Sequence, residues 1–414
     1  MTEFSRIGGE LHAEGVPLAV IAERFGTPCY VYSRRALESR FTAFDTAFAG
    51  APHLVCYAIK ANSNLAVLGI LARLSSGFDI VSGGELARVV AAGGEVGKTV
   101  FSGVGKTDAE IEQALQAGIY CFNVESAAEL ETLNTLAGRT GKVAPMSLRV
   151  NPDVDPKTHP YIATGLKDTK FGIAYADAPA LYRHAASLPH IAVKGIDCHI
   201  GSQITDLSVY VETAQKMFAL VDYIEADGIA LRHIDLGGGL GIRYRDEVLI
   251  DPSDYARAVR HALGARRHEL LFEPGRYLVG ESGVLLTRVI HVKPGQNRNY
   301  AIVDAAMNDL IRPALYDAWH DVEPVLVRGE PSRRWQVVGP VCESGDFLAR
   351  DRDLSLAPGD LLAVHAAGAY GFVMSSNYNS RPRACEIVVD GDRIHLARPR
   401  ERVEDLFASE SVLK

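Results

Sequence analysis

A regular alternation of short apolar runs with amphipathic segments extends over residues 28–276 and restricts the fold more than any other feature. The alternation is typical of repeated βα units around a parallel sheet. The apolar runs are HLVCYAI (53–59), GFDIVS (77–82), TVFSG (99–103), YCFNV (120–124), PMSLRVN (145–151), VKGIDCHIG (193–201), LRHIDLGGG (231–239) and ELLFEPG (269–275). Eight strands with intervening helices over roughly 250 residues predict an α/β fold, a (β/α)8 TIM-like barrel. An open doubly wound sheet is the alternative, since one boundary error changes the strand count.

Segments between these runs carry helix signals. Residues 83–94, 108–118 and 126–138 place apolar side chains at helical spacing. Several of the segments begin at a Ser or Asp that can cap a helix, and several end on Gly. The pattern predicts helices that alternate with the strands.

The pattern changes after Arg276 to β-rich runs without regular helices, such as 283–293 and 384–397. These runs predict a C-terminal antiparallel β-sandwich or β-barrel domain. A chain of 414 residues is also longer than one core usually serves. We therefore expect the barrel at 28–276, the β domain at 277–414, and an N-terminal segment at 1–27 that pairs with the β domain.

Charge and cysteine content exclude several classes of protein. The net charge of -8, without a basic run, argues against nucleic acid or an anionic membrane as a partner. The N-terminus lacks the pattern of a secretory signal, and no apolar stretch has the length of a membrane span. The six cysteines lie far apart, without the spacing of a metal site. The sequence thus predicts a cytoplasmic enzyme with reduced thiols and no bound metal.

Reactive groups of such a barrel gather at the carboxyl ends of its strands, so polar residues there are the first candidates. Lys60 ends the first run in YAIKAN (57–62). Taken alone it can be a solvated lysine at the end of a strand. In a partly desolvated barrel mouth its pKa would instead fall, as a Schiff-base nucleophile requires.

The sixth, seventh and eighth runs end in further candidates. His199 and Ser202 lie in HIGSQI, and Gly239 lies in GGGLGI, whose backbone N–H groups can approach a phosphate closely. A dinucleotide fingerprint would need glycine at position 242, which is Ile, so a nicotinamide site is disfavoured. Glu273 ends the last strand, where a buried carboxylate needs a partner, either a heterocyclic N–H or an ordinary salt bridge.

The order of these motifs resembles one family. YAIKAN, HIGSQI, GGGLGI and EPGR are followed by CESGD (342–346) and GAYG (368–371). In this order they look like the diaminopimelate, ornithine and arginine decarboxylases of the alanine-racemase fold. The resemblance covers nearly the whole chain, and six ordered motifs are far more specific than any one of them.

The resemblance implies pyridoxal 5'-phosphate as cofactor and assigns residues to it. Lys60 would form the Schiff base, and His199 would stack on the pyridine ring. The phosphate would be bound by Ser202, Gly239, Gly275, Arg276 and Tyr370. Glu273 would pair with the pyridine nitrogen, where related racemases place an arginine, and this difference favours decarboxylation.

The same resemblance implies a homodimer with shared active sites. Cys342 and Glu343 match a loop that reaches the active site of the neighbouring subunit, with the cysteine implicated in returning a proton to the substrate carbon. Without the motif, a buried cysteine before a solvated glutamate would be the simpler interpretation.

Substrate choice follows from the groups expected at the far end of the substrate. In meso-diaminopimelate this end carries a carboxylate and an ammonium. Arg276, Arg312 and Tyr316 match the carboxylate pattern of diaminopimelate-type enzymes, and Glu343 matches the ammonium partner. Tyr370 is also expected at the substrate. These matches favour decarboxylation of diaminopimelate to L-lysine and CO2, the last step of lysine biosynthesis.

Two alternatives remain. Ornithine-type or lysine-type decarboxylases generally have an aspartate after the cysteine, where this chain has Glu343, and arginine decarboxylases are much longer. A non-catalytic, regulatory relative that binds the cofactor would keep the fold but typically loses the lysine or the phosphate-site residues. All of those residues are present here.

Overall fold

The computed structural model describes residues 4–156 and 170–413 and divides into two compact units. The barrel unit comprises Arg40–Ile242 and Val248–Leu278, and the β unit comprises Met1–Ser39, Arg243–Glu247 and Val279–Lys414. The division differs from the expected boundaries at 27/28 and 276/277. The reason is long-range strand pairing, because residues 29–33, which lie inside the expected barrel range, form a strand in the sheet of the β unit.

The barrel unit contains a closed ring of eight parallel strands. They are β5 (His53–Ala58), β6 (Gly77–Ile80), β7 (Thr99–Phe101), β8 (Cys121–Val124), β9 (Ala144–Asn151), β11 (Ile191–Asp197), β12 (His233–Asp235) and β13 (Glu269–Phe272). Each strand pairs in parallel with the next, and β13 pairs with β5 to close the ring. A short ninth strand, β10 (Ile173–Ala174), extends beside β9. The predicted TIM-like barrel is confirmed, with each of the eight runs forming one strand.

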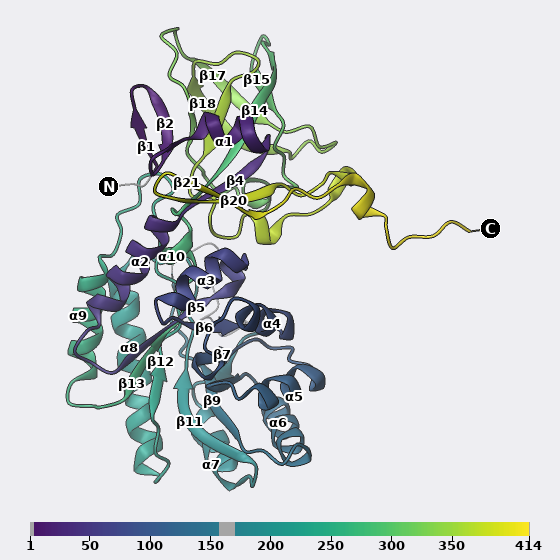
Figure 1. Ribbon diagram of the computed structural model, residues 1–414. Helices are drawn as coiled ribbons and strands as arrows, with labels where there is room; N and C mark the ends of the chain where they lie inside the picture. Colours follow the sequence, from purple (N-terminus) through teal and green to yellow (C-terminus); the bar gives the residue numbers. More distant parts are fainter. Residues whose placement is uncertain (1–3, 157–169, 414) are drawn as a thin grey trace. The chain divides into compact units, whose positions relative to one another are not determined.

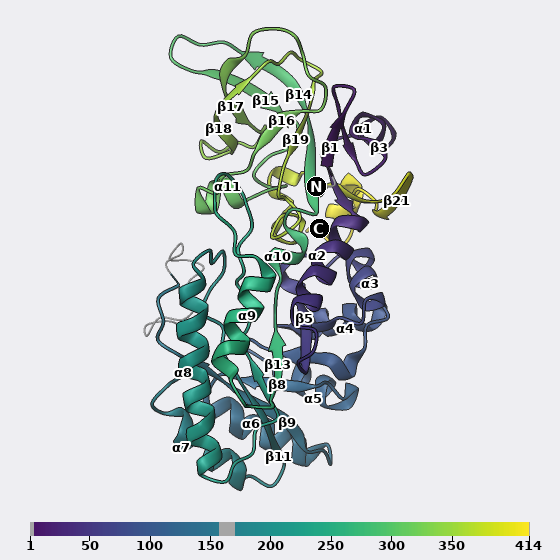
Figure 2. The same ribbon diagram turned by 90° about the vertical axis from the view of Figure 1, so that its left-hand side faces the viewer.

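Helices surround these strands (Figures 1 and 2). They are α3 (Leu65–Arg73), α4 (Gly83–Ala91), α5 (Asp108–Ala117), α6 (Ala127–Arg139), α7 (Ala178–Ser187), α8 (Leu207–Ala226) and α9 (Pro252–Leu263). Two further helices, α2 (Arg34–Ala47) and α10 (Arg276–Val279), cross the borders between the units. Ser82, Thr107 and Ser126 cap three of the helices through their side-chain oxygens. The three helices expected from the sequence are therefore present, within a few residues of the expected bounds.

The β unit contains a three-stranded and a nine-stranded sheet. The first sheet holds β1 (Phe4–Ile7), β2 (Glu10–Ala13) and β3 (Val16–Pro17). The second holds β4 (Cys29–Ser33), β14 (Gly283–Lys293), β15 (Asn299–Val303), β16 (Val322–Pro324), β17 (Arg333–Val338), β18 (Phe347–Leu354), β19 (Leu361–Val364), β20 (Cys385–Asp390) and β21 (Arg393–Arg398). Two helices, α1 (Leu18–Phe25) and α11 (Arg312–Tyr316), complete the unit. Its pairing is mostly antiparallel, as expected, although β15 with β17 and β4 with β20 run in parallel.

The N-terminal segment packs on this same unit. Leu11 donates its backbone N–H to the carbonyl of Val325 at 2.8 Å. Phe4 and Ile21 belong to a buried apolar cluster that also contains Val284. Burial of these side chains, together with the backbone bond, supplies the main stabilisation of the segment.

Short 3-10 turns occur at several strand and loop ends. They are η1 (Ile59–Ala61), η2 (Val96–Lys98), η4 (Phe372–Met374), η5 (Tyr378–Ser380) and η6 (Val403–Leu406). Among the residues that the structure describes, no helix combines the length and hydropathy needed to cross a membrane.

Candidate active site

Lys60 lies at the carboxyl end of β5, in the short turn η1. Its Nζ donates to Oδ2 of Asp79 at 2.5 Å. Asp79 is part of β6 and is fully buried, while the lysine side chain keeps 35% of its surface exposed. The buried carboxylate therefore holds the amine at the mouth of the barrel, within reach of solvent.

His199 follows the end of β11, and its imidazole is neutral. Its Nδ1 accepts a hydrogen bond from the backbone N–H of Gly238 at 3.1 Å, which leaves the ring proton on Nε2. Burial lowers the pKa of His199 well below its usual value, and the charges of Arg149 and Lys60 lower it further. A neutral ring of this kind can stack on another aromatic ring without a charge to solvate.

The glycine loop after β12 is joined by hydrogen bonds to the loop that holds His199. Ile204 donates its backbone N–H to the carbonyl of Gly239 at 2.9 Å, and Ile242 donates to Oε1 of Gln203 at 3.1 Å. Gly239 has φ of +101°, and a Cβ there would lie 2.4 Å from the carbonyl oxygen of Gly201. Only glycine fits this position, and its backbone can approach a phosphate closely.

The turn after β13 meets the same loop through Arg276. The guanidinium is buried, and its Nε and Nη2 donate to Oγ of Ser202 at 3.2 and 3.0 Å. A Cβ at Gly275 would press on Ala58 and Ala61 at 3.2 and 3.1 Å. The ends of β5, β11, β12 and β13 thus converge, and the structure brings Ser202, Gly239, Gly275 and Arg276 together near one end of the barrel.

Glu273 is a buried carboxylate at the end of β13. Its Oε1 accepts weak hydrogen bonds from Ser102 Oγ at 3.4 Å and from Asn123 Nδ2 at 3.3 Å. Burial raises the pKa of Glu273 well above its usual value, and the neighbouring carboxylates Asp235, Asp79 and Asp197 raise it further. Among the described residues, none forms a salt bridge with Glu273. Within the described residues, the salt bridge that was one of the two possible partners of Glu273 is therefore not formed.

The site also contains buried charged residues that were not among the candidates predicted from the sequence. Carboxylate oxygens of Asp197, Asp235 and Glu273 all lie within 4.8 Å of one another. Arg149 pairs with the buried Glu125 at 2.9 Å. Each of the two aspartates and Arg149 lies inside one of the predicted strand runs, and that was the signal available in the sequence. Carboxylates this close and this buried cannot all be ionised, so the group retains protons near neutral pH.

Arg312 and Tyr316, the candidates for carboxylate binding, lie on α11 in the β unit. The guanidinium of Arg312 is buried, and its Nε donates to Nε2 of His320 at 3.3 Å. The rings of Tyr244 and Tyr316 lie 5.0 and 5.8 Å from the guanidinium carbon. These contacts fix the plane of the guanidinium, as bidentate binding of a carboxylate requires.

Cys342, Glu343 and Tyr370, the remaining candidates, also belong to the β unit. Cys342 and Glu343 are exposed in the connection between β17 and β18. Glu343 accepts a hydrogen bond at 2.5 Å from the hydroxyl of Tyr378. Tyr370 is partly buried and has φ of +54°, a strained value for a residue with a side chain. Cys342 is therefore exposed, and not buried as the simpler interpretation without the motif would have it.

Comparison with known proteins places the fold in a family. The model of the family described as pyridoxal-dependent decarboxylase, pyridoxal binding domain, matches residues 34–280. The chain belongs to the pyridoxal-dependent decarboxylases. A diaminopimelate decarboxylase of Pseudomonas aeruginosa is 59% identical to it, with 100% of both sequences covered. One of Vibrio cholerae is 58% identical, with 98% of this chain and 97% of the relative covered.

Solved structures of decarboxylases agree with this placement. Diaminopimelate decarboxylase from Helicobacter pylori, complexed with L-lysine, is 43% identical and has a TM-score of 0.92, with 95% of this chain and 99% of that chain covered. The enzyme from M. jannaschii, in co-complex with L-lysine, is 37% identical and has a TM-score of 0.95, with 99% and 98% covered. A lysine/ornithine decarboxylase from Vibrio vulnificus, at 23% identity and a TM-score of 0.80, shows only the shared fold.

The barrel unit fits the cofactor that this decarboxylase family binds. Lys60 offers an amine at the barrel mouth, and the glycine loop offers backbone that only glycine can form. Glu273 is buried with no cation paired to it among the described residues, and such a carboxylate is suited to a protonated ring nitrogen. The donor set therefore matches the amine, phosphate and ring-nitrogen requirements of pyridoxal phosphate.

Proposed function

We propose that this chain decarboxylates meso-2,6-diaminopimelate to L-lysine and CO2 with pyridoxal phosphate as cofactor, the last step of lysine biosynthesis. The observation that carries the proposal is full-length identity of up to 59% to diaminopimelate decarboxylases. Two related diaminopimelate decarboxylases, from Helicobacter pylori and M. jannaschii, have been solved in complex with L-lysine, the product of this reaction. The enzyme is thus a carboxy-lyase.

Within the proposed site, the barrel residues bind and orient the cofactor. Bound pyridoxal phosphate supplies an electron sink for the electron pair left behind when CO2 departs. Lys60 would hold the cofactor through its amine, and the neutral imidazole of His199 would pack on the ring. Ser202, Gly239, Gly275 and Arg276 bind the phosphate with Tyr370.

Glu273 keeps a proton at the ring nitrogen. In the chain alone, burial and the adjacent carboxylates raise the pKa of Glu273. The positive charge of a protonated ring nitrogen beside it would supply the missing counter-ion and favour the carboxylate form that accepts its hydrogen bond. A protonated ring nitrogen strengthens the electron sink, which favours loss of CO2.

The far end of the substrate meets groups from the β unit. Arg312, with Tyr316 and Arg276, holds the distal carboxylate, and Glu343 binds the distal ammonium. The thiol of Cys342 delivers a proton to the carbon that has lost CO2, so one C–C bond breaks and one C–H bond forms. Exposure of Cys342 and Glu343 on the β unit supports a role at the active site of a second copy, and hence a homodimer with shared sites.

Two other functions are less well supported. A decarboxylase for ornithine, lysine or arginine would have no use for a buried arginine directed at a distal carboxylate. A regulatory relative without turnover would be expected to lack part of the site, whereas Lys60, His199, Glu273 and Cys342 are all present. The cytoplasm is the proposed location, since all six cysteines are free thiols, as is usual in a reducing compartment.

Stoichiometry measured on the purified holoenzyme tests this proposal. Addition of meso-diaminopimelate should release CO2 and L-lysine in equal amounts while the cofactor absorbance persists over many turnovers. Bound cofactor without any CO2 release would instead identify a non-catalytic relative. CO2 release without lysine would show that the decarboxylated product is not the one proposed.

A further inference from the structure

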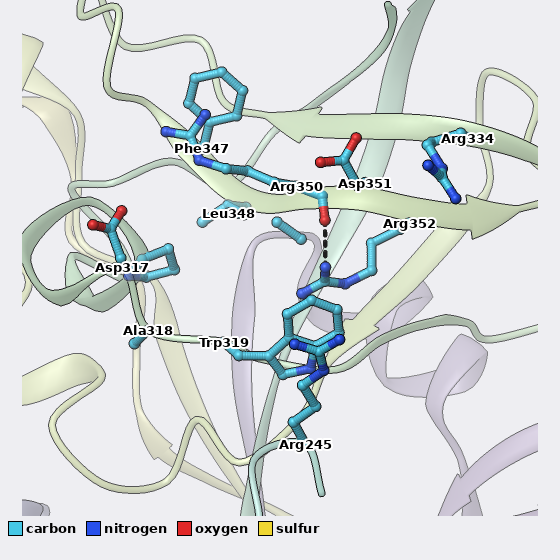
Figure 3. A pocket seen from close by; sticks show the side chains of 12 residues that line it. Arg245, Asp317, Ala318, Trp319, Arg334, Phe347, Leu348, Arg350, Asp351 and Arg352 are labelled. Atoms are coloured by element: carbon cyan, nitrogen blue, oxygen red, sulfur yellow. Dashed lines mark hydrogen bonds between the residues drawn. The ribbon is translucent and has the colours of Figure 1, made fainter. Parts of the chain in front are cut away.

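The β unit contains a pocket surrounded by arginine side chains (Figure 3). Its volume is about 450 Å³, within the range of about 300 to 1,000 Å³ that is typical of small-molecule sites. Its lining includes Arg245, Arg334, Arg350 and Arg352. The twelve described residues that line it do not include Arg312 or any other residue assigned above to the substrate.

Arg352, on β18, is a buried cation without a carboxylate partner among the described residues. Its exposed fraction is 6%. Nη2 donates to the carbonyl of His320 at 2.8 Å, and Nη1 donates to the carbonyl of Arg350. Nε is buried and has no hydrogen-bond partner among the described residues. Burial of a charge without a counter-ion is unfavourable, so the guanidinium would be stabilised by an anion.

The electrostatic surroundings of Arg352 point the same way. Burial lowers the pKa of the guanidinium to about 10, and the charge of Arg245 lowers it further, although Asp321 and Asp351 oppose this effect. Loss of solvation is therefore the main cost to this cation, and the nearby carboxylates offset it only in part. An anion in the pocket would reverse that penalty.

Aromatic rings fix the orientation of the neighbouring guanidiniums. The guanidinium carbons of Arg352 and Arg245 lie 3.2 and 4.5 Å from the ring centre of Trp319, and that of Arg350 lies 3.6 Å from the ring centre of Phe347. Figure 3 shows Arg352 and Arg245 beside the indole of Trp319. Stacked guanidiniums keep their N–H edges available for a planar acceptor.

Acidic groups near the pocket are already engaged or exposed. Asp351 accepts a hydrogen bond from Nε2 of Gln336 at 2.7 Å, and Asp353 pairs with Arg334 at 3.6 Å. Asp317 is exposed at the end of α11. Asp321, which raises the pKa of Arg352 most, is exposed and accepts a hydrogen bond from the backbone N–H of Val322 at 3.0 Å. Within the described chain, no carboxylate forms an ion pair with Arg245 or Arg350.

We propose that the pocket binds a small oxyanion, a carboxylate or a phosphate group, through Arg245, Arg350 and Arg352. The anion accepts hydrogen bonds from the edges of the stacked guanidiniums and supplies the counter-ion that buried Arg352 lacks. The lining residues of the pocket differ from those assigned to the substrate, and the proposal does not depend on the proposed function.

Calorimetric titration of the holoenzyme tests the proposal. Inorganic phosphate and malonate serve as the two probes, at an ionic strength held constant with chloride, and bound cofactor keeps its own phosphate site filled. The double variant Arg245→Ala/Arg350→Ala changes exposed side chains, so its fold should be preserved. Arg393→Ala removes an exposed arginine on β21 that does not line the pocket, and it serves as the matched control.

At least one probe should bind the parent enzyme saturably. Its affinity for the double variant should be at least tenfold lower, and its affinity for Arg393→Ala should be within twofold of that for the parent. Preference for malonate or phosphate then identifies the carboxylate or phosphate source. Equal binding by parent and double variant would overturn the proposal. The absence of saturable binding to the parent would also overturn the proposal. If the double variant then changes the sedimentation mass, a second copy of the chain covers the pocket instead of an anion.

Discussion

The ammonium of Lys60 lies 2.5 Å from the carboxylate of Asp79, across the adjacent strands β5 and β6 of the barrel. Asp79 is fully buried, and its second oxygen has no hydrogen-bond partner among the described residues. The pair holds the amine at the end of the barrel where the glycine loop and Arg276 also lie. The lysine is therefore already positioned for covalent attachment of the cofactor.

Replacement of the lysine tests this position. Lys60→Ala should abolish both turnover and the visible absorbance of covalently attached cofactor, because the alanine offers no amine. Cofactor can still bind through its phosphate. Borohydride reduction of the parent followed by peptide mapping should find the cofactor on Lys60, and its attachment to another lysine would contradict the assignment.

Glu273→Gln tests the carboxylate at the ring nitrogen. The amide cannot stabilise a protonated nitrogen, so the decarboxylation rate should fall more than tenfold, a barrier increase of roughly 1.4 kcal/mol. Cofactor affinity should stay within a few fold, since the phosphate contacts are unchanged. Steady-state kinetics and equilibrium dialysis of the cofactor measure the two effects, and a near-normal rate would reduce Glu273 to a structural role.

Asp235→Asn tests the buried acidic group through the pH dependence of stability. Burial raises the pKa of Asp235 from 3.8 to about 7, with the charge of Asp79 contributing, so the folded apoprotein binds a proton that the unfolded chain releases. Stability from this group is complete below pH 3.8 and is lost as the pH rises through about 7. The Tm of the apoprotein should therefore fall less between pH 4 and 7 in Asp235→Asn than in the parent. The exposed control Asp392→Asn should follow the parent, and parallel curves for all three proteins would refute the idea.

The sequence predicts the barrel well because each of its strands is a compact apolar run bordered by turn or helix signals. It does not indicate β18, since FLARDRDL has charged residues at positions 350–353 and lacks an apolar run. Only the pairing with β17 and the burial of Arg352 make it a strand. In the same way, β4 lies inside the residue range expected for the barrel. Its place in the β unit could not be predicted, because its partners β14 and β20 lie more than 250 residues away in sequence.

Candidate site residues also divide into those that local sequence patterns indicate and those that depend on tertiary structure. Lys60 and Glu273 stand at the ends of recognisable runs, so strand position and motif order both indicate them. Asp197 and Asp235 are visible as charges inside predicted strand runs, but their closeness to Glu273 depends on the parallel register of β11 with β12 and of β12 with β13. That register is a tertiary fact that no local pattern contains.

Complementation tests the proposed shared sites. If Cys342 and Glu343 serve the barrel of a second copy, inactive Lys60→Ala mixed with inactive Glu343→Ala should regain activity under conditions that exchange subunits. Each heterodimer would contain one intact site of two. Sedimentation and a tag on one variant establish heterodimer formation, and no regained activity in proven heterodimers would mean that each chain builds its own site.

CO2 release from meso-diaminopimelate, ornithine, arginine and lysine, measured in parallel for the parent and for Arg312→Ala, tests the central claim most directly. The parent should strongly prefer diaminopimelate. Loss of the buried guanidinium would leave the distal carboxylate without its charged partner, at a cost on the order of 2 to 5 kcal/mol in transition-state binding. Lysine has no distal carboxylate, so its slow reaction should change little while the diaminopimelate rate collapses. A parent that prefers another substrate, or an Arg312→Ala variant within about threefold of the parent on diaminopimelate, well under 1 kcal/mol, would contradict the account.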